Sequence, residues 1–237
     1  MTSTRADFVA AFDLDGTLVD TPGAIVETFT AVFAATGVPA PAAPAIRATI
    51  GMPLERAFAG LLGVPPDDGA VADAVRRYQA HFREHILPRA RALVFPGVAE
   101  GLAALRGDGM VLAVATSKVT PSAEALLAAA GLRHLFHHVI GADQVTRPKP
   151  DPEMGHLVLR RSGLTAGDAV MVGDTVHDIA MAGAAGMRSI AVTYGVHGLA
   201  ELLPAGPTAV ADLFADVVTS VRALRRKSIV PLQESAP

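Results

Sequence analysis

Two aspartates, Asp13 and Asp15, lie two residues apart directly after a short apolar run, in the segment DLDGTLVD (13–20). At the end of a strand and just before a glycine, both carboxylates can reach one pocket as the chain leaves extended geometry. Gly16 permits a sharp turn and a close approach of the backbone. Phosphoryl transfer needs a nucleophile on one side of phosphorus and a proton donor for the departing oxygen on the other. This pair of carboxylates could supply both.

Polar residues also follow two later apolar runs. Thr116 comes directly after VLAVA (111–115), with Ser117 and Lys118 as adjacent alternatives that rank lower. Asp174 follows AVMVG (169–173) and opens the segment that contains Asp178. Acidic oxygens of this kind are the ligands that Mg²⁺ prefers, commonly one or two carboxylates with water and substrate phosphate.

Lys149 is one of three lysines in the chain and lies between two prolines in RPKPDP (147–152). A compact ammonium held in such a turn suits orienting a carboxylate and neutralising phosphate.

The elements that must position these residues alternate along the chain. Short apolar runs predict strands at 8–12, 110–115, 169–173 and 189–195, with Ala/Leu-rich helices at 97–106, 121–130 and 175–185. This alternation predicts an α/β fold with a doubly wound parallel sheet covered on both faces. Ligands bind beyond the carboxyl ends of the strands in such sheets, so the polar residues there can converge on one site.

The region 20–92 has a different pattern. Helical stretches are expected at about 22–36, 53–62 and 69–87, and no strand run lies among them. We therefore expect a small all-helical domain at 20–92, inserted after the first strand of a core formed by 1–19 and 93–225. The segment 226–237, with little structural signal, is expected to be a C-terminal tail.

The four segments, each after an expected strand, resemble in order the motifs of the haloacid dehalogenase superfamily, specifically its phosphoglycolate phosphatase-like and β-phosphoglucomutase-like members with a helical cap. The resemblance covers nearly the whole chain. It implies that Asp13 is the nucleophile, Asp15 the general acid and base, and Thr116 and Lys149 the groups that hold phosphate. It also implies that Asp13, the carbonyl of Asp15 and Asp174 bind Mg²⁺, with Asp178 in support.

Substrate contacts are expected from Gly16, Thr17 and Ser117 beside the nucleophile. In the expected cap, the loop around Gly51, Met52 and Pro53, with Arg47 and Arg56, is the candidate specificity region. The implied activity is Mg²⁺-dependent hydrolysis of a small anionic phosphomonoester, similar to phosphoglycolate or a sugar phosphate, through an aspartyl-phosphate.

Single residues distinguish this chain from other enzymes of the superfamily. Dehalogenases lack the acid/base aspartate, and phosphonoacetaldehyde hydrolases need a cap lysine, whereas no lysine precedes Lys118. β-Phosphoglucomutases carry a cap arginine where Leu54 stands, although Arg56 could substitute. A mutase or a pyrophosphatase therefore remains open.

Other classes are less favoured. The segment HFREH (81–85) formally fits a zinc-protease pattern but offers no third ligand. Signalling receiver domains have a different order of acidic residues and about half this length. A degenerate binding module of the phosphatase fold is disfavoured by the intact set of motif residues.

Composition is consistent with a globular enzyme. The 237 residues are 51% hydrophobic, with a net charge of −3 and no cysteine. We expect a cytoplasmic protein, monomeric or homodimeric, without a nucleic-acid or membrane partner.

Overall fold

The computed structural model describes residues 6–229. Its centre is a six-stranded parallel sheet with the strand order β3-β2-β1-β4-β5-β6. The strands are β1 (Val9–Phe12), β2 (Val111–Ala115), β3 (His138–Ile140), β4 (Ala169–Gly173), β5 (Arg188–Val192) and β6 (Ala209–Ala211). The predicted α/β fold with a parallel sheet is confirmed.

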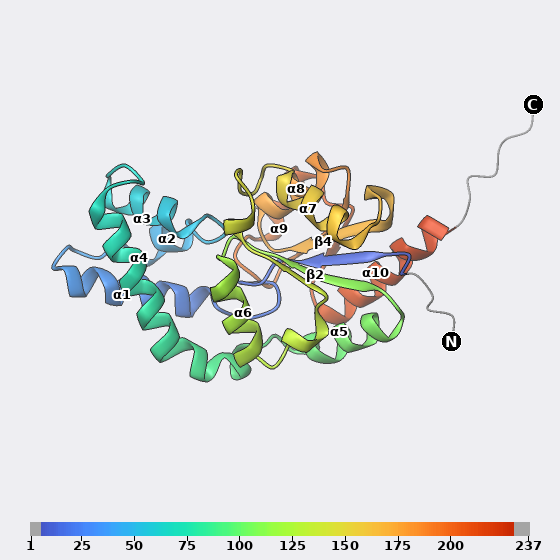
Figure 1. Cartoon of the computed structure of the whole chain (residues 1–237), viewed down its shortest axis with the longest axis horizontal. Helices are drawn as coiled ribbons and strands as arrows, with labels where there is room; N and C mark the ends of the chain where they lie inside the picture. The colour runs from blue at the N-terminus through green and yellow to red at the C-terminus, as the bar shows by residue number, and fades with distance from the viewer. Residues whose placement is uncertain (1–5, 230–237) are drawn as a thin grey trace, which may run out of the picture.

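Helices cover both faces of this sheet (Figure 1). α5 (Val98–Gly107), α6 (Thr120–Ala129) and α10 (Phe214–Ile229) lie on one face, and α7 (Glu153–Ser162) and α8 (Val176–Ala184) lie on the other. Alternate residues of β1 therefore enter different cores: Ala10 and Phe12 pack in one, Val9 and Ala11 in the other. Burial on both faces explains why the strands are continuously apolar.

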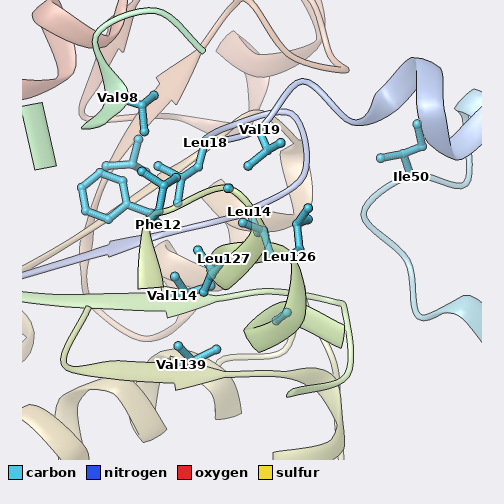
Figure 2. Packing of buried hydrophobic residues seen from close by; sticks show 14 of the residues in the cluster. Phe12, Leu14, Leu18, Val19, Ile50, Val98, Val114, Leu126, Leu127 and Val139 are labelled. Atoms are coloured by element: carbon cyan, nitrogen blue, oxygen red, sulfur yellow. The ribbon is translucent and has the colours of Figure 1, made fainter. Parts of the chain in front are cut away.

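The core on the side of α5, α6 and α10 extends along the loop after β1 (Figure 2). Phe12 lies against Phe136 and Phe214, with ring centroids 6.3 and 6.1 Å away. Leu14 and Leu18 are fully buried in the same cluster. The apolar residues of DLDGTLVD thus anchor the loop, while its aspartates stay at the edge of the sheet.

Between Pro22 and Leu93 the regular elements are helical. They are α1 (Pro22–Thr36), α2 (Ala43–Arg47), α3 (Leu54–Leu62), α4 (Gly69–His81), the π-helical turn η1 (Phe82–Ile86) and the 3₁₀ segment η2 (Leu87–Leu93). We call this the helical segment; it extends to one side of the sheet in Figure 1. Its own apolar centre includes Phe29, Phe58 and Tyr78, with Phe29 and Phe58 centroids 4.4 Å apart.

The two connections between the helical segment and the sheet lie side by side. Asp20 donates its backbone N–H to the carbonyl of Leu93, and Phe95 donates to that of Leu18. Val19 and Val94 form an antiparallel bridge between them. The helical segment is therefore joined to the core by two connecting segments that hydrogen-bond to each other through their backbones.

Some elements differ from the sequence expectation. The strands β3 and β6 were not predicted, because three residues each give too short an apolar pattern. The tail boundary at 226 was wrong: α10 continues to Ile229, and residues 230–237 lie outside the described range. The short elements α9 (Leu199–Leu202), η3 (Arg133–Leu135), η4 (Ala142–Gln144), η5 (Ala166–Asp168) and η6 (Leu203–Ala205) complete the connections. No helix within residues 6–229 is long and apolar enough to cross a membrane.

Candidate active site

Three neighbouring strands end at the same edge of the sheet. β1 pairs in register with β2 and β4, and Phe12 lies opposite Val114 and Val172. Asp13 follows β1, Thr116 follows β2 and Asp174 follows β4. The three polar side chains therefore meet at the centre of the sheet although they are far apart in the sequence.

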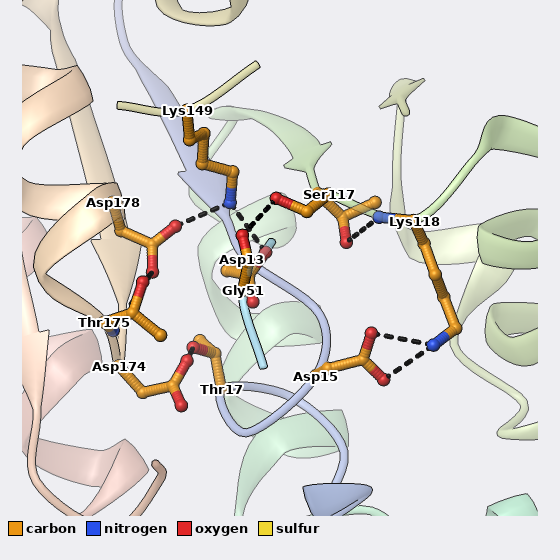
Figure 3. Close-up of polar contacts among 11 residues, drawn as sticks. Asp13, Asp15, Thr17, Gly51, Ser117, Lys118, Lys149, Asp174, Thr175 and Asp178 are labelled. Atoms are coloured by element: carbon orange, nitrogen blue, oxygen red, sulfur yellow. Dashed lines mark hydrogen bonds and ion pairs between the residues drawn. The ribbon is translucent and has the colours of Figure 1, made fainter. Parts of the chain in front are cut away.

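Lys149 joins two of the carboxylates at this edge (Figure 3). Its ammonium nitrogen lies 2.7 Å from Oδ1 of Asp13 and 2.6 Å from Oδ1 of Asp178. All three side chains are almost completely buried. Burial and these short charge-assisted contacts fix Asp13 in one orientation.

Asp178 is also fixed from a second direction. Its other carboxylate oxygen accepts hydrogen bonds from the N–H and hydroxyl of Thr175, the residue before α8. This reciprocal cap provides hydrogen-bond partners at the first turn of α8. It also directs the remaining carboxylate oxygen of Asp178 toward Lys149. The cap of α8 and the contact of Asp178 with Lys149 thus use different oxygens of one side chain.

Asp174 is held by Thr17 and by the backbone. The Thr17 hydroxyl donates to Oδ1 at 2.9 Å, and the N–H of Val196 donates to Oδ2 at 2.8 Å. The backbone of Gly16 approaches so closely that a Cβ there would lie 2.2 Å from Oδ2. Gly16 also has a φ of +84°, which side chains other than glycine rarely adopt.

The electrostatics of this cluster are unbalanced. Burial, with the nearby charge of Asp178, raises the pKa of Asp13 from 3.8 to about 7 despite the opposing charge of Lys149. Burial and the charges of Asp13 and Asp178 raise the pKa of Asp174 well above its usual value. The pKa of Lys149 is raised because its two carboxylate partners outweigh its burial. One buried lysine thus faces three buried acids.

The surplus negative charge fits a divalent cation. Asp13, Asp174 and Asp178 each offer one oxygen, and the three oxygens lie within 4.8 Å of one another. Hard oxygen donors at the end of a parallel sheet suit Mg²⁺. The expected ligands Asp13 and Asp174 are therefore together, whereas the carboxylate of Asp15 points elsewhere.

Asp15 faces Lys118 on the other side of Asp13 (Figure 3). Its two oxygens lie 3.1 and 2.9 Å from the Lys118 ammonium, and Oδ1 accepts a 2.6 Å hydrogen bond from Thr21. Lys118 also lies over the ring of Phe82, 4.6 Å from its centroid. The aspartate pair is thus divided: Asp13 turns toward the acidic cluster, and Asp15 turns toward the helical segment.

A cavity of about 440 Å³ opens between this edge and the helical segment. Asp13, Asp15, Thr116, Ser117 and Lys118 line its floor. The loop that contains Gly51 reaches the floor, because the Ser117 hydroxyl donates to the Gly51 carbonyl at 2.7 Å. The catalytic candidates from the core therefore face a space whose roof comes from α1, α3, α4 and η1.

The sequence agrees with this geometry. Residues 10–192 match the family model described as haloacid dehalogenase-like hydrolase. The chain belongs to the haloacid dehalogenase-like hydrolases.

Curated relatives of this haloacid dehalogenase-like hydrolase are named phosphatases. The chain is 53% identical to "Probable phosphatase IndB" of Dickeya dadantii over 221 residues, 93% of the chain and 96% of that protein. It is 34% identical to a phosphoglycolate phosphatase of Pectobacterium atrosepticum, over 88% of the chain and 89% of that protein. A solved structure of a haloacid dehalogenase-like family hydrolase from Streptococcus pneumoniae superimposes with a TM-score of 0.76 at 29% identity, covering 90% of this chain and 97% of that chain. The expected class, a phosphomonoester hydrolase, is consistent with these names.

Not every expected site residue of this haloacid dehalogenase-like hydrolase lies at the cavity. Gly16 and Thr17 pack against Asp174 instead, and Thr17 is fully buried. Arg47 and Arg56 are exposed and do not line the cavity. Both arginines lie on the solvent-exposed sides of α2 and α3, whereas Ile46 and Phe58 of the same helices are buried.

Several residues at the cavity were not expected there. The sequence favours Thr116 over Lys118 as the polar site residue after β2, yet Lys118 pairs with Asp15. Phe29, Tyr78 and Phe82 form part of the roof, where their sequence signal is an ordinary apolar helix face. The histidines of HFREH, His81 and His85, lie outside the acidic cluster and the cavity lining.

Proposed function

We propose that this chain is a Mg²⁺-dependent phosphatase that hydrolyses a small phosphomonoester through an aspartyl-phosphate on Asp13. The observation that carries the proposal is the division of the aspartate pair. Asp13 lies among Lys149, Asp174 and Asp178, while Asp15 lies 2.9 Å from Lys118 and faces the cavity. A nucleophile and a proton donor on different sides of a bound phosphoryl group are what in-line displacement needs.

In this mechanism Asp13 attacks phosphorus and Asp15 donates a proton to the departing oxygen. Asp15 then takes a proton from the water that hydrolyses the acyl phosphate. Lys149 orients Asp13, while Thr116 on the floor binds phosphate oxygens. Bound at Asp13 and Asp174 with Asp178 in support, Mg²⁺ would supply positive charge for the phosphoryl oxygens. The helical segment, as a cap, would exclude water from the reacting groups.

A phosphosugar mutase is less well supported. That reaction requires a second phosphate-binding group on the roof, where the resemblance expects an arginine. Leu54 lines the cavity at that place, and Arg56 is exposed outside it. Hydrolysis requires no such group. The relatives from Dickeya dadantii and Pectobacterium atrosepticum are both named phosphatases.

The test is phosphate release from a panel of phosphate esters with and without Mg²⁺. The panel comprises phosphoglycolate, sugar phosphates, nucleotides and pyrophosphate. We expect metal-dependent release that falls at least about 10³-fold in Asp13→Asn, since the covalent step loses its nucleophile. Asp20→Asn is the matched control, because Asp20 belongs to the same segment but is exposed. Near-normal turnover by folded Asp13→Asn would show that the proposal is wrong.

A further inference from the structure

The buried part of the roof of the cavity is apolar except for the Tyr78 hydroxyl. Its buried members on the helical segment are Ile25, Phe29, Ile50, Ala57, Tyr78 and Phe82, each 6% exposed or less. The polar side chains of the same roof, Thr49, Glu55, Gln79 and Arg83, are half-buried or exposed. Apart from the Tyr78 hydroxyl, whatever enters the deep part of the cavity therefore meets carbon atoms on that side.

Three of these residues form a continuous aromatic surface. The ring centroids of Phe29 and Tyr78 are 5.1 Å apart, and those of Tyr78 and Phe82 are 5.9 Å apart with planes inclined by only 20°. Rings at such separations favour offset-stacked or edge contacts with a further ring. The core also contributes Val119, Pro121 and Ala125 to the lining. Both the helical segment and the core thus supply apolar groups to the cavity.

The charges of the lining do not suit an anionic leaving group. Its cationic side chains are Lys118 and Arg83. Both oxygens of Asp15 already bind the Lys118 ammonium, and Arg83 is exposed. Glu55 and Asp143 add negative charge to the wall. A carboxylate buried here would lose its hydration without gaining a buried cation of its own.

The size of the cavity also exceeds the needs of a very small ester. Its volume of about 440 Å³ lies within the range of about 300–1,000 Å³ that is typical of sites for drug-sized ligands. A two-carbon alcohol such as glycolate would leave most of the apolar wall facing water. Removing that wall from water favours a larger, apolar occupant.

We propose that the leaving group of the substrate is an alcohol that carries a planar aromatic or heteroaromatic ring, not a small carboxylate. This inference rests on the proposed phosphatase activity and names its substrate class. The phosphoryl group lies on the floor at Asp13, Asp15 and Thr116. The ring lies against Phe29, Tyr78 and Phe82, with polar substituents directed toward Gln79 and Arg83 at the rim.

The experiment compares esters that differ in the ring. Benzyl phosphate and ethyl phosphate form a matched pair, since both release an uncharged primary alcohol and only one of these alcohols carries a ring. A nucleoside 5′-monophosphate, ribose 5-phosphate and phosphoglycolate complete the set. We expect kcat/KM for the ring-bearing esters to exceed that for ethyl phosphate and phosphoglycolate at least tenfold. A preference for phosphoglycolate or for ribose 5-phosphate would overturn the inference while leaving the phosphatase proposal intact.

A variant that narrows the cavity provides the second arm. Ala125→Leu adds bulk to the wall on α6, and Ala128→Leu makes the same change on an exposed face of that helix. The ratio of kcat/KM for benzyl to ethyl phosphate should fall at least fivefold in Ala125→Leu and stay within twofold in Ala128→Leu. Phe29→Leu, which keeps a buried apolar side chain, should lower the same ratio if Ala125→Leu does not fold.

The outcomes separate the two claims. An unchanged ratio in folded Ala125→Leu or Phe29→Leu would contradict the placement of the ring. Release that needs no metal, or that survives in Asp13→Asn, would instead overturn the proposed function, and the inference with it. Metal-dependent release with a preference for ring-bearing esters would support both.

Discussion

Asp13 is buried together with two other acids, and a single lysine lies within hydrogen-bonding distance of it. This concentration of negative charge opposes folding, and it fits the cation-binding role proposed for these three acids. The same reasoning separates Asp13 from Asp15, whose partners Lys118 and Thr21 give it a balanced environment. Asp13 and Asp15, only two residues apart, therefore lie in different electrostatic environments.

The raised pKa of Asp13 predicts a pH-dependent effect of Asp13→Asn on stability without metal. The pKa is about 7 in the folded chain against 3.8 ordinarily, so the folded state retains a proton that the unfolded state has lost. The contribution of Asp13 to the free energy of unfolding is therefore greatest below pH 4 and falls as pH rises to about 7. Relative to wild type, Asp13→Asn should gain stability across this window, by at most about 1.4 kcal/mol per pH unit.

Urea unfolding in the presence of a chelator measures this difference at several pH values. Asp20→Asn serves as the control, since its carboxylate is exposed. A difference between Asp13→Asn and wild type that does not vary between pH 4 and 7 would contradict the assigned environment of Asp13.

Gly16 predicts a second effect at a single position. A Cβ at Gly16 would lie 2.2 Å from Oδ2 of Asp174, and φ is +84°. Gly16→Ala must therefore displace Asp174 or the loop, and we expect the Mg²⁺ concentration for half-maximal activity to rise at least tenfold. Gly23→Ala, in α1 with no atom near the added Cβ, should leave it unchanged. A normal metal requirement in Gly16→Ala would argue against Asp174 as a ligand.

At the scale of elements, the loop around Gly51 is one contact between the helical segment and the floor of the site. Its carbonyl accepts the Ser117 hydroxyl, and Gly51 lies close to Thr175, the cap of α8. One loop thus touches the residues after β2 and after β4. In the proposed mechanism, this arrangement would couple closure of the helical segment to the ends of β2 and β4.

Ser117→Ala should weaken this closure. Loss of the hydrogen bond is expected to speed amide hydrogen exchange in residues 47–54 and to lower kcat/KM about three- to tenfold. Ser162→Ala, which removes a hydroxyl bonded within α7, is the matched control. Unchanged exchange in 47–54 would mean that Ser117 does not hold the loop.

Elements also mark the limit of prediction from the sequence. Strands β1, β2, β4 and β5 were predictable because their apolar runs are long enough to show burial on both faces. β3 and β6 have three residues each, and only pairing with β2 and β5 makes them strands. The end of α10 at Ile229 was missed because basic residues such as Arg226 and Lys227 resemble a polar tail, although α10 continues through them.

At the scale of the whole molecule, the site depends on contacts between distant parts of the chain. Asp13, Thr116, Lys149 and Asp174 were found from the sequence because each follows a recognisable strand or turn. The pairing of Lys118 with Asp15 and the aromatic roof were not, since no local pattern shows which residue of a helical segment faces the core. Arg47 and Arg56 were expected at the cavity from proximity in sequence to Gly51, but helix geometry turns both outward.

The most direct test of the mechanism is to trap the covalent intermediate. Asp15→Asn lacks the group that activates water, and p-nitrophenyl phosphate has a leaving group that needs no protonation, so attack by Asp13 should continue while hydrolysis stalls. With Mg²⁺ we predict a burst of p-nitrophenol equal to the enzyme concentration, and acid quenching followed by peptide mass spectrometry should place the phosphoryl group on Asp13. A phosphoryl group on another residue, or slow release of both products together without a burst, would contradict the assignment of Asp13 as the nucleophile.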